Sequence, residues 1–313
     1  MDEARAAQPN HTSGAAAVAR IWAGALGRLL LFGVLFVALV EIIAVLTFPL
    51  GDQGSMARIA LGGFIWLTAA LIASAITIRA LDRRSWRALG LGFDRIAAGA
   101  TIFGLAFGVV LIVIAVALML ATGDLAFTRT AGNGDAASAV LGSFAALALP
   151  AAAEEAIFRG YPIQVLTRAA GAPLAVLTTS AAFAAVHADN PAADSLALAN
   201  IFLAGVLLAV VYLRTGNLWA ATAVHLGWNW GMAGLFDLPV SGLAWIDVPG
   251  FEPVVSGPAW WNGAAFGPEG GVIGTIVFVG ATVFALRTGW FTRMPVQQPK
   301  HRMLHHESLN EGS

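Results

Sequence analysis

The sequence predicts an all-α, polytopic integral membrane protein with about eight transmembrane helices and both termini in the cytoplasm. Composition, the number of long apolar runs and the placement of basic residues support this fold class. Of the 313 residues, 58% are hydrophobic and only 11% are charged, whereas soluble domains carry about 25% charged residues. The mean hydropathy is +0.77. This composition excludes an ordinary water-soluble globule.

The apolar runs locate the predicted spans in chain order. A helix needs about 20 consecutive, mostly apolar residues to cross a bilayer. Runs of this kind lie at residues 29–50, 57–79, 97–121, 137–158, 171–188, 195–213, 217–236 and 270–287. The fourth run continues as a polar helix to residue 168. We therefore expect eight spans, or fewer if the segment 171–188 is re-entrant.

The basic residues test this number independently, because cytoplasmic loops of membrane proteins are enriched in Lys and Arg. With the N-terminus placed inside, all seventeen Lys and Arg residues except Arg58 and Arg129 fall on the cytoplasmic side. An error in the number of spans would scramble this division. Compact basic loops and the lack of a recognisable targeting segment favour a multi-pass protein of a cell membrane, with a bacterial inner or plasma membrane as the expected location.

The chain divides into three predicted parts. Residues 1–28 form a cytoplasmic tail without the apolar core of a signal peptide, and residues 29–290 form the transmembrane helical domain. Residues 291–313 form a polar tail that we expect to be disordered. Between spans, residues 80–96 are basic and suit the inner membrane surface. Residues 237–269 are acidic and rich in Gly, Pro and Trp, which suits an outer interfacial cap, either a plain connection or a substrate gate.

Composition also excludes several function classes. The chain contains no cysteine, which excludes disulfides, thiolate zinc sites and cysteine nucleophiles. Its formal net charge of −1 provides no basic field for nucleic acid. We therefore expect the lipid bilayer, and not nucleic acid, as a partner.

A few polar side chains lie inside the predicted spans. An ionisable residue at the centre of a span costs about 2.5–3.5 kcal/mol to insert, so it suggests a function by default. Glu154 and Glu155 lie in the fourth span, His187 lies in the fifth, and His225 lies with Asn229 in the seventh. These residues are the candidates for chemistry.

Helical spacing orients the first pair of candidates. Glu155 and Arg159 are four residues apart and share one helix face, which favours an ion pair. Glu154 points about 100° away from Glu155, so one carboxylate can be neutralised while the other faces a different environment. Taken alone, Glu155 and Arg159 are more simply interpreted as a buried structural ion pair than as catalytic groups.

The other candidates show the same spacing. His225 and Asn229 are four residues apart, as are Phe183 and His187. Counted at about 1.5 Å per residue from the cytoplasmic helix ends, Glu154, His187 and Asn229 lie at similar depth. His225 lies one turn shallower. An interhelical hydrogen bond explains His225 and Asn229 as well as chemistry does, but the whole set at matched depth favours an active site.

Three short motifs resemble those of the CPBP family, which comprises the CAAX prenyl endopeptidase and the bacteriocin-processing intramembrane proteases. Residues 154–159 read E-E-A-I-F-R and fit E-E-x-x-x-R, residues 183–187 fit F-x-x-x-H, and residues 225–229 fit H-x-x-x-N. They stand in the family's order on separate predicted helices. The resemblance covers about residues 80–235, which would form a protease-like core.

The resemblance implies an intramembrane endopeptidase that acts on a membrane-associated or lipidated peptide or protein. In the family pattern Glu154 activates water as a general base, with His187 as its partner. His225 and Asn229 stabilise the oxyanion of the tetrahedral intermediate. The residues that the pattern assigns are, as catalytic groups, Glu154, His187, His225 and Asn229 and, as supporting groups, Glu155, Arg159 and Phe183.

Metal dependence stays open at this point. Glu154, His187 and His225 are the residues that would bind zinc with an open fourth position, although no H-E-x-x-H pair is present. We favour a site without a cofactor and keep zinc as the alternative.

Other function classes have weaker support in the sequence. Residues 132–135 spell the G-x-G-D string of aspartyl intramembrane proteases, but they lie in an outer loop and are interpreted as a turn. No serine elbow lies on a span. The alternatives to a protease are an ion-coupled transporter, in which the buried Glu and His residues form a relay, and a non-catalytic scaffold of the same fold.

Overall fold

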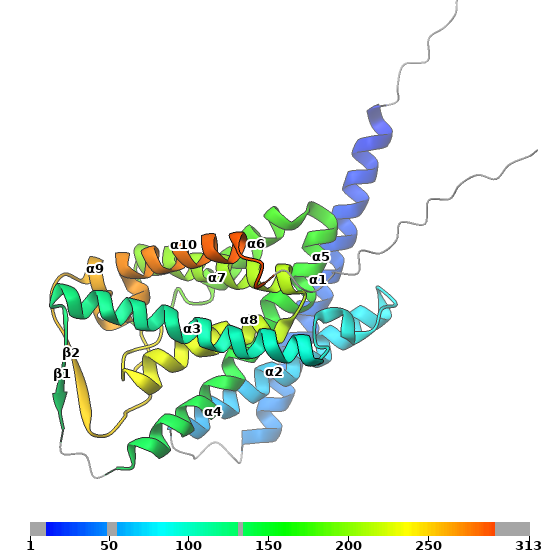
Figure 1. Cartoon of the computed structure of the whole chain (residues 1–313). Coiled ribbons are helices and arrows are strands. Elements are labelled where there is room, and N and C mark those ends of the chain that lie inside the picture. The colour runs from blue at the N-terminus through cyan, green and yellow to red at the C-terminus, as the bar shows by residue number, and fades with distance from the viewer. Residues whose placement is uncertain (1–10, 49–54, 131–133, 292–313) are drawn as a thin grey trace, which may run out of the picture.

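The structure, a computed structural model, describes residues 11–48, 55–130 and 134–291 (Figure 1). The predicted tail at 291–313 lies outside the described residues apart from Phe291. Most of the described chain is helical, as the sequence predicts, and its two strands are β1 (Leu125–Arg129) and β2 (Phe251–Val255). The first helix begins at His11, because the Ala-rich segment after it has a high helix propensity.

Apart from the first helix, which begins at His11 and not near residue 29, the element bounds follow the predicted runs closely. The α-helices are α1 (His11–Thr47), α2 (Ser55–Ala80), α3 (Arg95–Thr122), α4 (Ala136–Glu155), α5 (Tyr161–Ala170), α6 (Ala172–Ala185), α7 (Ser195–Thr215), α8 (Leu218–Trp230), α9 (Ala259–Asn262) and α10 (Val272–Arg287). Two π-helical turns, η3 (Ala156–Gly160) and η4 (Gly231–Leu235), extend α4 and α8, and the 3₁₀ turns are η2 (Trp86–Leu89), η5 (Ala264–Phe266) and η6 (Pro268–Gly270).

Five of these segments are long and apolar enough to cross a membrane. They are Ala16–Thr47, Ser55–Ala80, Arg95–Thr122, Ala136–Ala170 and Ser195–Thr215. The remaining apolar helices, α6, α8 and α10, are shorter. The structure therefore supports a polytopic membrane protein, while eight spans and the cytoplasmic placement of the termini stay predictions.

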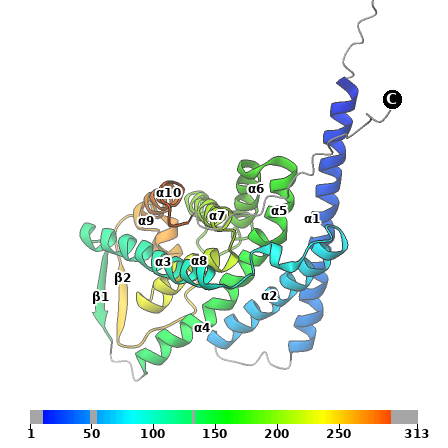
Figure 2. The same ribbon diagram turned by 45° about the vertical axis from the view of Figure 1, so that its right-hand side comes forward.

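Helix α8 is the central helix of the bundle. It packs against α3, α4 and α7, and side chains on nearly all its sides are buried between Leu218 and Trp228. Around it, α2 packs against α4, and α7 packs against both α6 and α10 (Figures 1 and 2). Because α8 is enclosed, the polar residues that it carries face protein and not lipid.

Glycine allows α3 and α8 to approach each other closely. A Cβ atom built on Gly108 would lie 2.2 Å from the carbonyl oxygen of Val224, and one on Gly227 would lie 2.4 Å from that of Leu105. Gly104 and Gly108 are four residues apart, the small-xxx-small spacing of tightly packed membrane helices. The contact between α3 and α8 therefore depends on backbone proximity.

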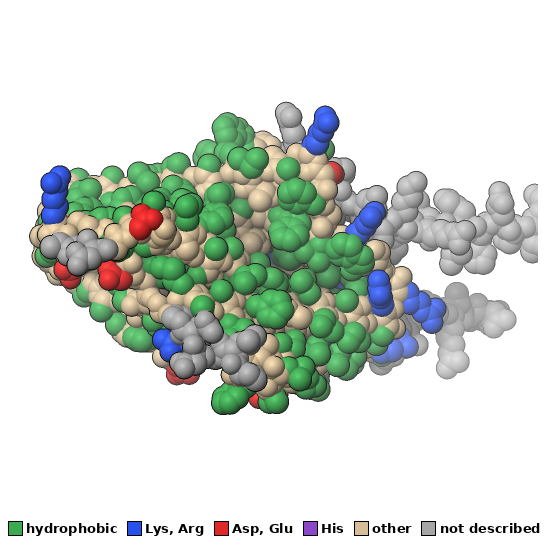
Figure 3. Space-filling model, turned by 90° about the horizontal axis from the view of Figure 1, so that it is seen from below, with side chains coloured by type: hydrophobic (Ala, Val, Ile, Leu, Met, Phe, Trp, Pro, Cys, Tyr) green, Lys and Arg blue, Asp and Glu red, His purple; other side chains and the backbone are tan. Residues whose placement is uncertain are grey.

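The outer surface fits a lipid environment. Helix α1 exposes most of its apolar side chains, and among the residues with described burial only Ala25 and Phe32 of this helix are fully buried. In the face seen in Figure 3, hydrophobic side chains cover the middle of the molecule, and Lys and Arg side chains gather at one end. This is the distribution that the sequence predicts for a membrane-spanning bundle.

The segment between η4 and α10 forms a structured cap at the opposite end. Strand β2 of this segment pairs antiparallel with β1, from Leu125 opposite Val255 to Arg129 opposite Phe251 (Figure 1). The predicted outer cap is therefore an ordered element, and part of it reaches into the interior of the bundle.

Candidate active site

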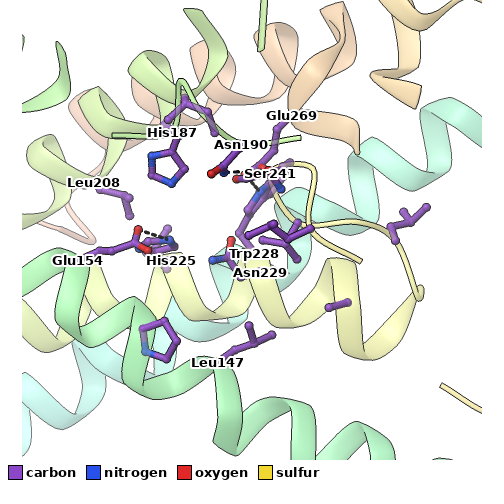
Figure 4. Close-up of a pocket in the computed structure, with 18 of the residues that line it drawn as sticks. Leu147, Glu154, His187, Asn190, Leu208, His225, Trp228, Asn229, Ser241 and Glu269 are labelled. Carbon is purple, nitrogen blue, oxygen red and sulfur yellow. Dashed lines mark hydrogen bonds and ion pairs between the residues drawn. The ribbon is translucent and has the colours of Figure 1, made fainter. Parts of the chain in front are cut away.

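The four candidate catalytic side chains line a single cavity (Figure 4). Glu154 comes from α4, His187 follows the end of α6, and His225 and Asn229 come from α8. The cavity has a volume of about 140 Å³, enough for several waters. The structure thus brings together residues that are 75 positions apart in the chain, from Glu154 to Asn229.

Irregular helix geometry positions the residues of α4. Pro150 lies inside this helix and cannot donate a backbone hydrogen bond to the preceding turn. The π-helical turn η3 begins directly after Glu155 and contains Arg159. Single π-helical turns are frequent at functional sites. Together these features set the directions of Glu154 and Glu155.

Glu155 and Arg159 form the ion pair that their spacing predicts. Arg159 Nη1 donates to Glu155 Oε1 at 3.0 Å, and both side chains are fully buried. Arg159 Nη2 also donates to the carbonyl oxygen of Gly205 on α7, at 2.9 Å. This pair joins α4 and η3 to α7, and neither residue lines the cavity itself.

His225 lies between the two carboxylates. Its Nδ1 is 3.1 Å from Glu155 Oε1, and its Nε2 is 3.7 Å from Glu154 Oε2. Because a carboxylate only accepts hydrogen bonds, Nδ1 carries the proton when Glu155 is ionised, and Nε2 faces Glu154. Glu154 Oε2 is buried and has no hydrogen-bond partner among the described residues.

His187 lies on another side of the cavity (Figure 4). Its Nδ1 is 2.7 Å from the carbonyl oxygen of Phe183, which fixes the proton on Nδ1 and leaves Nε2 as an acceptor. The Phe183 ring stacks under the Arg159 guanidinium at 4.6 Å and lies edge-on to His225. Among the described residues, no hydrogen bond or ion pair joins His187 to Glu154, so the predicted partnership of these two residues stays a prediction.

Sequence reasoning missed four polar residues of the cavity wall, Asn190, Asp237, Ser241 and Glu269. Asn190 follows α6, whereas Ser241 and Glu269 belong to the cap. Glu269 is 3% exposed and stands one residue before the last apolar run. It could have been found from the sequence as an acidic residue at the start of a span, a position that is costly to occupy without partners.

The candidate metal ligands do not form a metal site in this arrangement. Within the part of the chain that the structure describes, no group of three or more His, Cys, Asp or Glu side chains is placed to hold a metal ion. Glu154, His187 and His225 therefore do not meet the geometry that zinc requires, and we derive no step through a metal. The absence of a cofactor stays a prediction.

Comparison with known proteins identifies the segment that carries this site. Residues 136–231 match the family model described as type II CAAX prenyl endopeptidase Rce1-like. No curated protein matches the chain. The matched segment contains all three motifs and every candidate catalytic residue, whereas the cap lies outside it.

Proposed function

Because residues 136–231 carry an Rce1-like domain of the CPBP family of membrane proteases, we propose that the chain is an intramembrane endopeptidase. It would hydrolyse a peptide bond of a membrane-associated or lipidated peptide or protein. One observation carries the proposal: Glu154 has an unpartnered carboxylate oxygen that faces an imidazole in a cavity within the helical bundle. A free carboxylate oxygen is suited to accept a proton from water.

The geometry supports water activation by Glu154. Its Oε2 is 3.7 Å from His225 Nε2, too far for a direct hydrogen bond but close enough for one water to contact both atoms. In the proposed reaction Glu154 accepts a proton from this water, and the hydroxide oxygen attacks the scissile carbonyl carbon. When the carbon–nitrogen bond breaks, Glu154 passes the proton to the leaving amine.

The developing oxyanion needs donors, and α8 offers two. Asn229 lines the cavity one turn beyond His225. Its amide group does not titrate, so its NH₂ group is always able to donate hydrogen bonds. His225 Nε2 donates when the ring is doubly protonated. Fixed donors of this kind are worth about 10²–10³ in kcat. His187 Nε2, as an acceptor, would orient the water or the substrate N–H group.

A purified enzyme in detergent tests the proposal. Wild type, Glu154→Gln, His225→Ala and the control Glu252→Gln, which alters an exposed carboxylate on β2, are compared on short lipidated and unlipidated peptides. We expect Glu154→Gln to lose about 10²–10⁴-fold in kcat, with elution in size-exclusion chromatography unchanged. The Glu252→Gln control should cleave like wild type.

Two outcomes would contradict this function. Cleavage that survives Glu154→Gln would remove Glu154 from the mechanism, and Glu154-dependent ion flux in vesicles without cleavage would indicate the transporter alternative. A zinc chelator added to the same assay tests the cofactor. We propose a metal-free reaction, so loss of cleavage on chelation with recovery on added zinc would assign the site to the metalloproteases.

The cellular location follows from the same observations. The long apolar helices and the membrane protease family identify a membrane protein. We propose that it resides in a bacterial inner or plasma membrane, on the basis of its compact basic loops. Its partners would be the bilayer and the peptide or protein that it cleaves.

A further inference from the structure

One wall of the cavity comes from outside the family-matched segment. The four candidate catalytic residues lie within residues 136–231, whereas the cap contributes Ser241, Leu243, Trp245 and Ile246 to the lining. Trp245 is half exposed and Ile246 is partly buried. The candidate catalytic groups of the cavity therefore face a wall whose apolar side chains come from the cap.

A tight turn brings this segment into the cavity. The backbone N–H groups and carbonyl oxygens of Val240 and Leu243 bond to each other at 3.0 and 2.9 Å. The two central residues, Ser241 and Gly242, have φ angles of 48° and 82°, as in a type I′ turn. A Cβ atom on Gly242 would lie 2.0 Å from the carbonyl oxygen of Pro191, so only glycine allows the turn to lie against the loop that follows α6.

A buried carboxylate fastens the turn. Glu269 Oε2 accepts hydrogen bonds from Ser241 N at 2.9 Å and from Ser241 Oγ at 2.6 Å. Glu269 Oε1 accepts from Trp228 Nε1 on α8 at 2.8 Å. Asn200 Nδ2 donates to the backbone carbonyl of Glu269 at 2.8 Å. With three donors, the Glu269 carboxylate is satisfied inside the protein, and it joins the cap to the helix that carries His225.

The turn also holds the loop that carries His187. Asn190 Nδ2 donates to the carbonyl oxygen of Ser241 at 2.9 Å, and Asn190 N donates to the carbonyl oxygen of His187 at 3.1 Å. Glu269 is thus linked through Ser241 to the loop that carries His187. Through Trp228 it is linked to α8, the helix that carries His225. Figure 4 shows Ser241, Glu269 and Asn190 gathered on one side of the cavity, opposite Glu154.

We infer that the 240–246 segment forms a subsite for a large apolar side chain of the substrate peptide and that Glu269 is the positioning residue that holds this wall. The inference rests on the proposed function, because it names the substrate class of the same site. A peptide bound with its scissile carbonyl near Glu154 would place an adjacent side chain against Leu243 and Ile246. Apolar surfaces of this kind favour large apolar side chains over small or charged ones.

Photo-crosslinking to the full-length Glu154→Gln variant tests the subsite without requiring cleavage. The probes are two unprenylated decapeptides that differ at one position, with photoleucine in one and photolysine in the other. We expect photoleucine to label residues 240–246 at least about tenfold more than photolysine does, in line with the discrimination of apolar pockets. Equal labelling by the two probes, labelling confined to other segments, or no labelling would overturn the subsite.

Cysteine accessibility tests the role of Glu269. Because the chain has no cysteine, Ile246→Cys provides a single reporter for a water-soluble maleimide. We expect Glu269→Gln to raise its labelling rate at least tenfold, and Glu252→Gln, on the exposed strand β2 of the same cap, to leave it unchanged. Equal rates in the two variants would show that Glu269 does not hold the wall. If Glu269→Gln does not fold, Ser241→Ala removes one of the same hydrogen bonds and takes its place.

Kinetics separate this inference from the proposed function. With a cleaved peptide, Leu243→Ala should raise KM for a peptide with leucine at the varied position and leave kcat nearly unchanged, because the residue binds substrate and does not touch the reacting atoms. A fall in kcat alone would overturn the assignment. A wild-type protein that cleaves none of the peptides would contradict the proposed function. The crosslinking result would still decide the subsite.

Discussion

At the scale of single residues, Arg159 is a buried charge that depends on its partners, although its Nε has no hydrogen-bond partner among the described residues. Its guanidinium is fully buried, contacts Glu155 and the carbonyl oxygen of Gly205, and lies over the ring of Phe183. Ionised groups away from water are costly unless they are paired and hydrogen-bonded. Arg159 therefore fixes the charge balance of the site as well as the contact between α4 and α7.

Replacing Arg159 with methionine should destabilise the protein by about 3–5 kcal/mol, because Glu155 would remain buried without its main cation. The double variant Arg159→Met with Glu155→Gln should recover a large part of this loss, since no unpaired charge remains. Thermal and denaturant unfolding in detergent measure both variants. A double variant less stable than Arg159→Met alone would contradict this account.

Asp237, in the cap just beyond η4, is a second residue whose surroundings set its charge. Partial burial raises its pKa to about 6, a hydrogen bond from the backbone N–H of Val248 opposes this rise, and the nearby charges of Asp247 and Glu252 add to it. The folded state thus binds a proton more tightly than the unfolded state does. Stability from this group is present below the unfolded pKa near 4 and is lost as pH rises toward 6.

The variant Asp237→Asn should therefore be more stable than wild type at pH 7–8 and no more stable near pH 4. Asparagine keeps an acceptor oxygen for the Val248 N–H group and removes the charge that is unfavourable in this place. Unfolding midpoints measured in detergent between pH 4 and 8 check this. An equal gain at every pH would show that the charge of Asp237 is not the cause.

The spacing of single residues predicted some contacts and missed others for physical reasons. The four-residue separation of Glu155 and Arg159 indicated their ion pair, because both lie on one helix and helix geometry fixes the distance. Glu269 and Ser241 lie 28 positions apart in a segment without periodicity, and the turn that joins them is fixed by tertiary contacts. No local pattern predicts such a contact.

At the scale of elements, the packing of α3 on α8 depends on two short stretches of backbone. Gly108 lies against the carbonyl oxygen of Val224, whereas a Cβ atom added to Gly99 on the same helix would have no neighbouring atom within 4 Å. A side chain at the first position must push the helices apart, and one at the second meets open space. The two glycines therefore form a matched pair for experiment.

Gly108→Ala should destabilise the protein by about 1–3 kcal/mol through overpacking, and Gly99→Ala should be neutral or stabilising by up to about 1 kcal/mol through helix propensity. Because α8 carries His225, the first variant should also lower activity. Unfolding in detergent and peptide cleavage measure the two effects. Equal stability of the two variants would show that the close contact does not limit packing.

The helix ends near the site were harder to predict than the helices. The apolar runs located α2, α3 and α7 well, because burial and lipid exposure both select apolar residues there. The sequence gives no comparable signal for the π-helical turns η3 and η4, which follow the motifs on α4 and α8. A period of 3.6 residues does not encode such single π-helical turns.

At the scale of the whole molecule, the distribution of charge indicates how the protein is oriented in the membrane. Arg79, Arg83, Arg84 and Arg87 are exposed where α2 ends and η2 begins, and Asp82 there is paired with Arg28 and Arg168. The β1–β2 ladder lies at the other end of the bundle (Figure 1). A surface with basic groups at one end suits a cytoplasmic face, and the cap and its ladder would then lie outside.

This orientation can be measured because the chain has no cysteine of its own. Ser85→Cys places a reporter beside the basic residues, and Val254→Cys places one on the exposed edge of β2. In intact cells or spheroplasts, a membrane-impermeant maleimide should label Val254→Cys at once and Ser85→Cys only after the membrane is permeabilised. The reverse order would invert the orientation, and labelling of both before permeabilisation would mean that the number of spans between them is not odd. The expected result would also place the cap, and with it the proposed apolar subsite, on the outer side of the membrane.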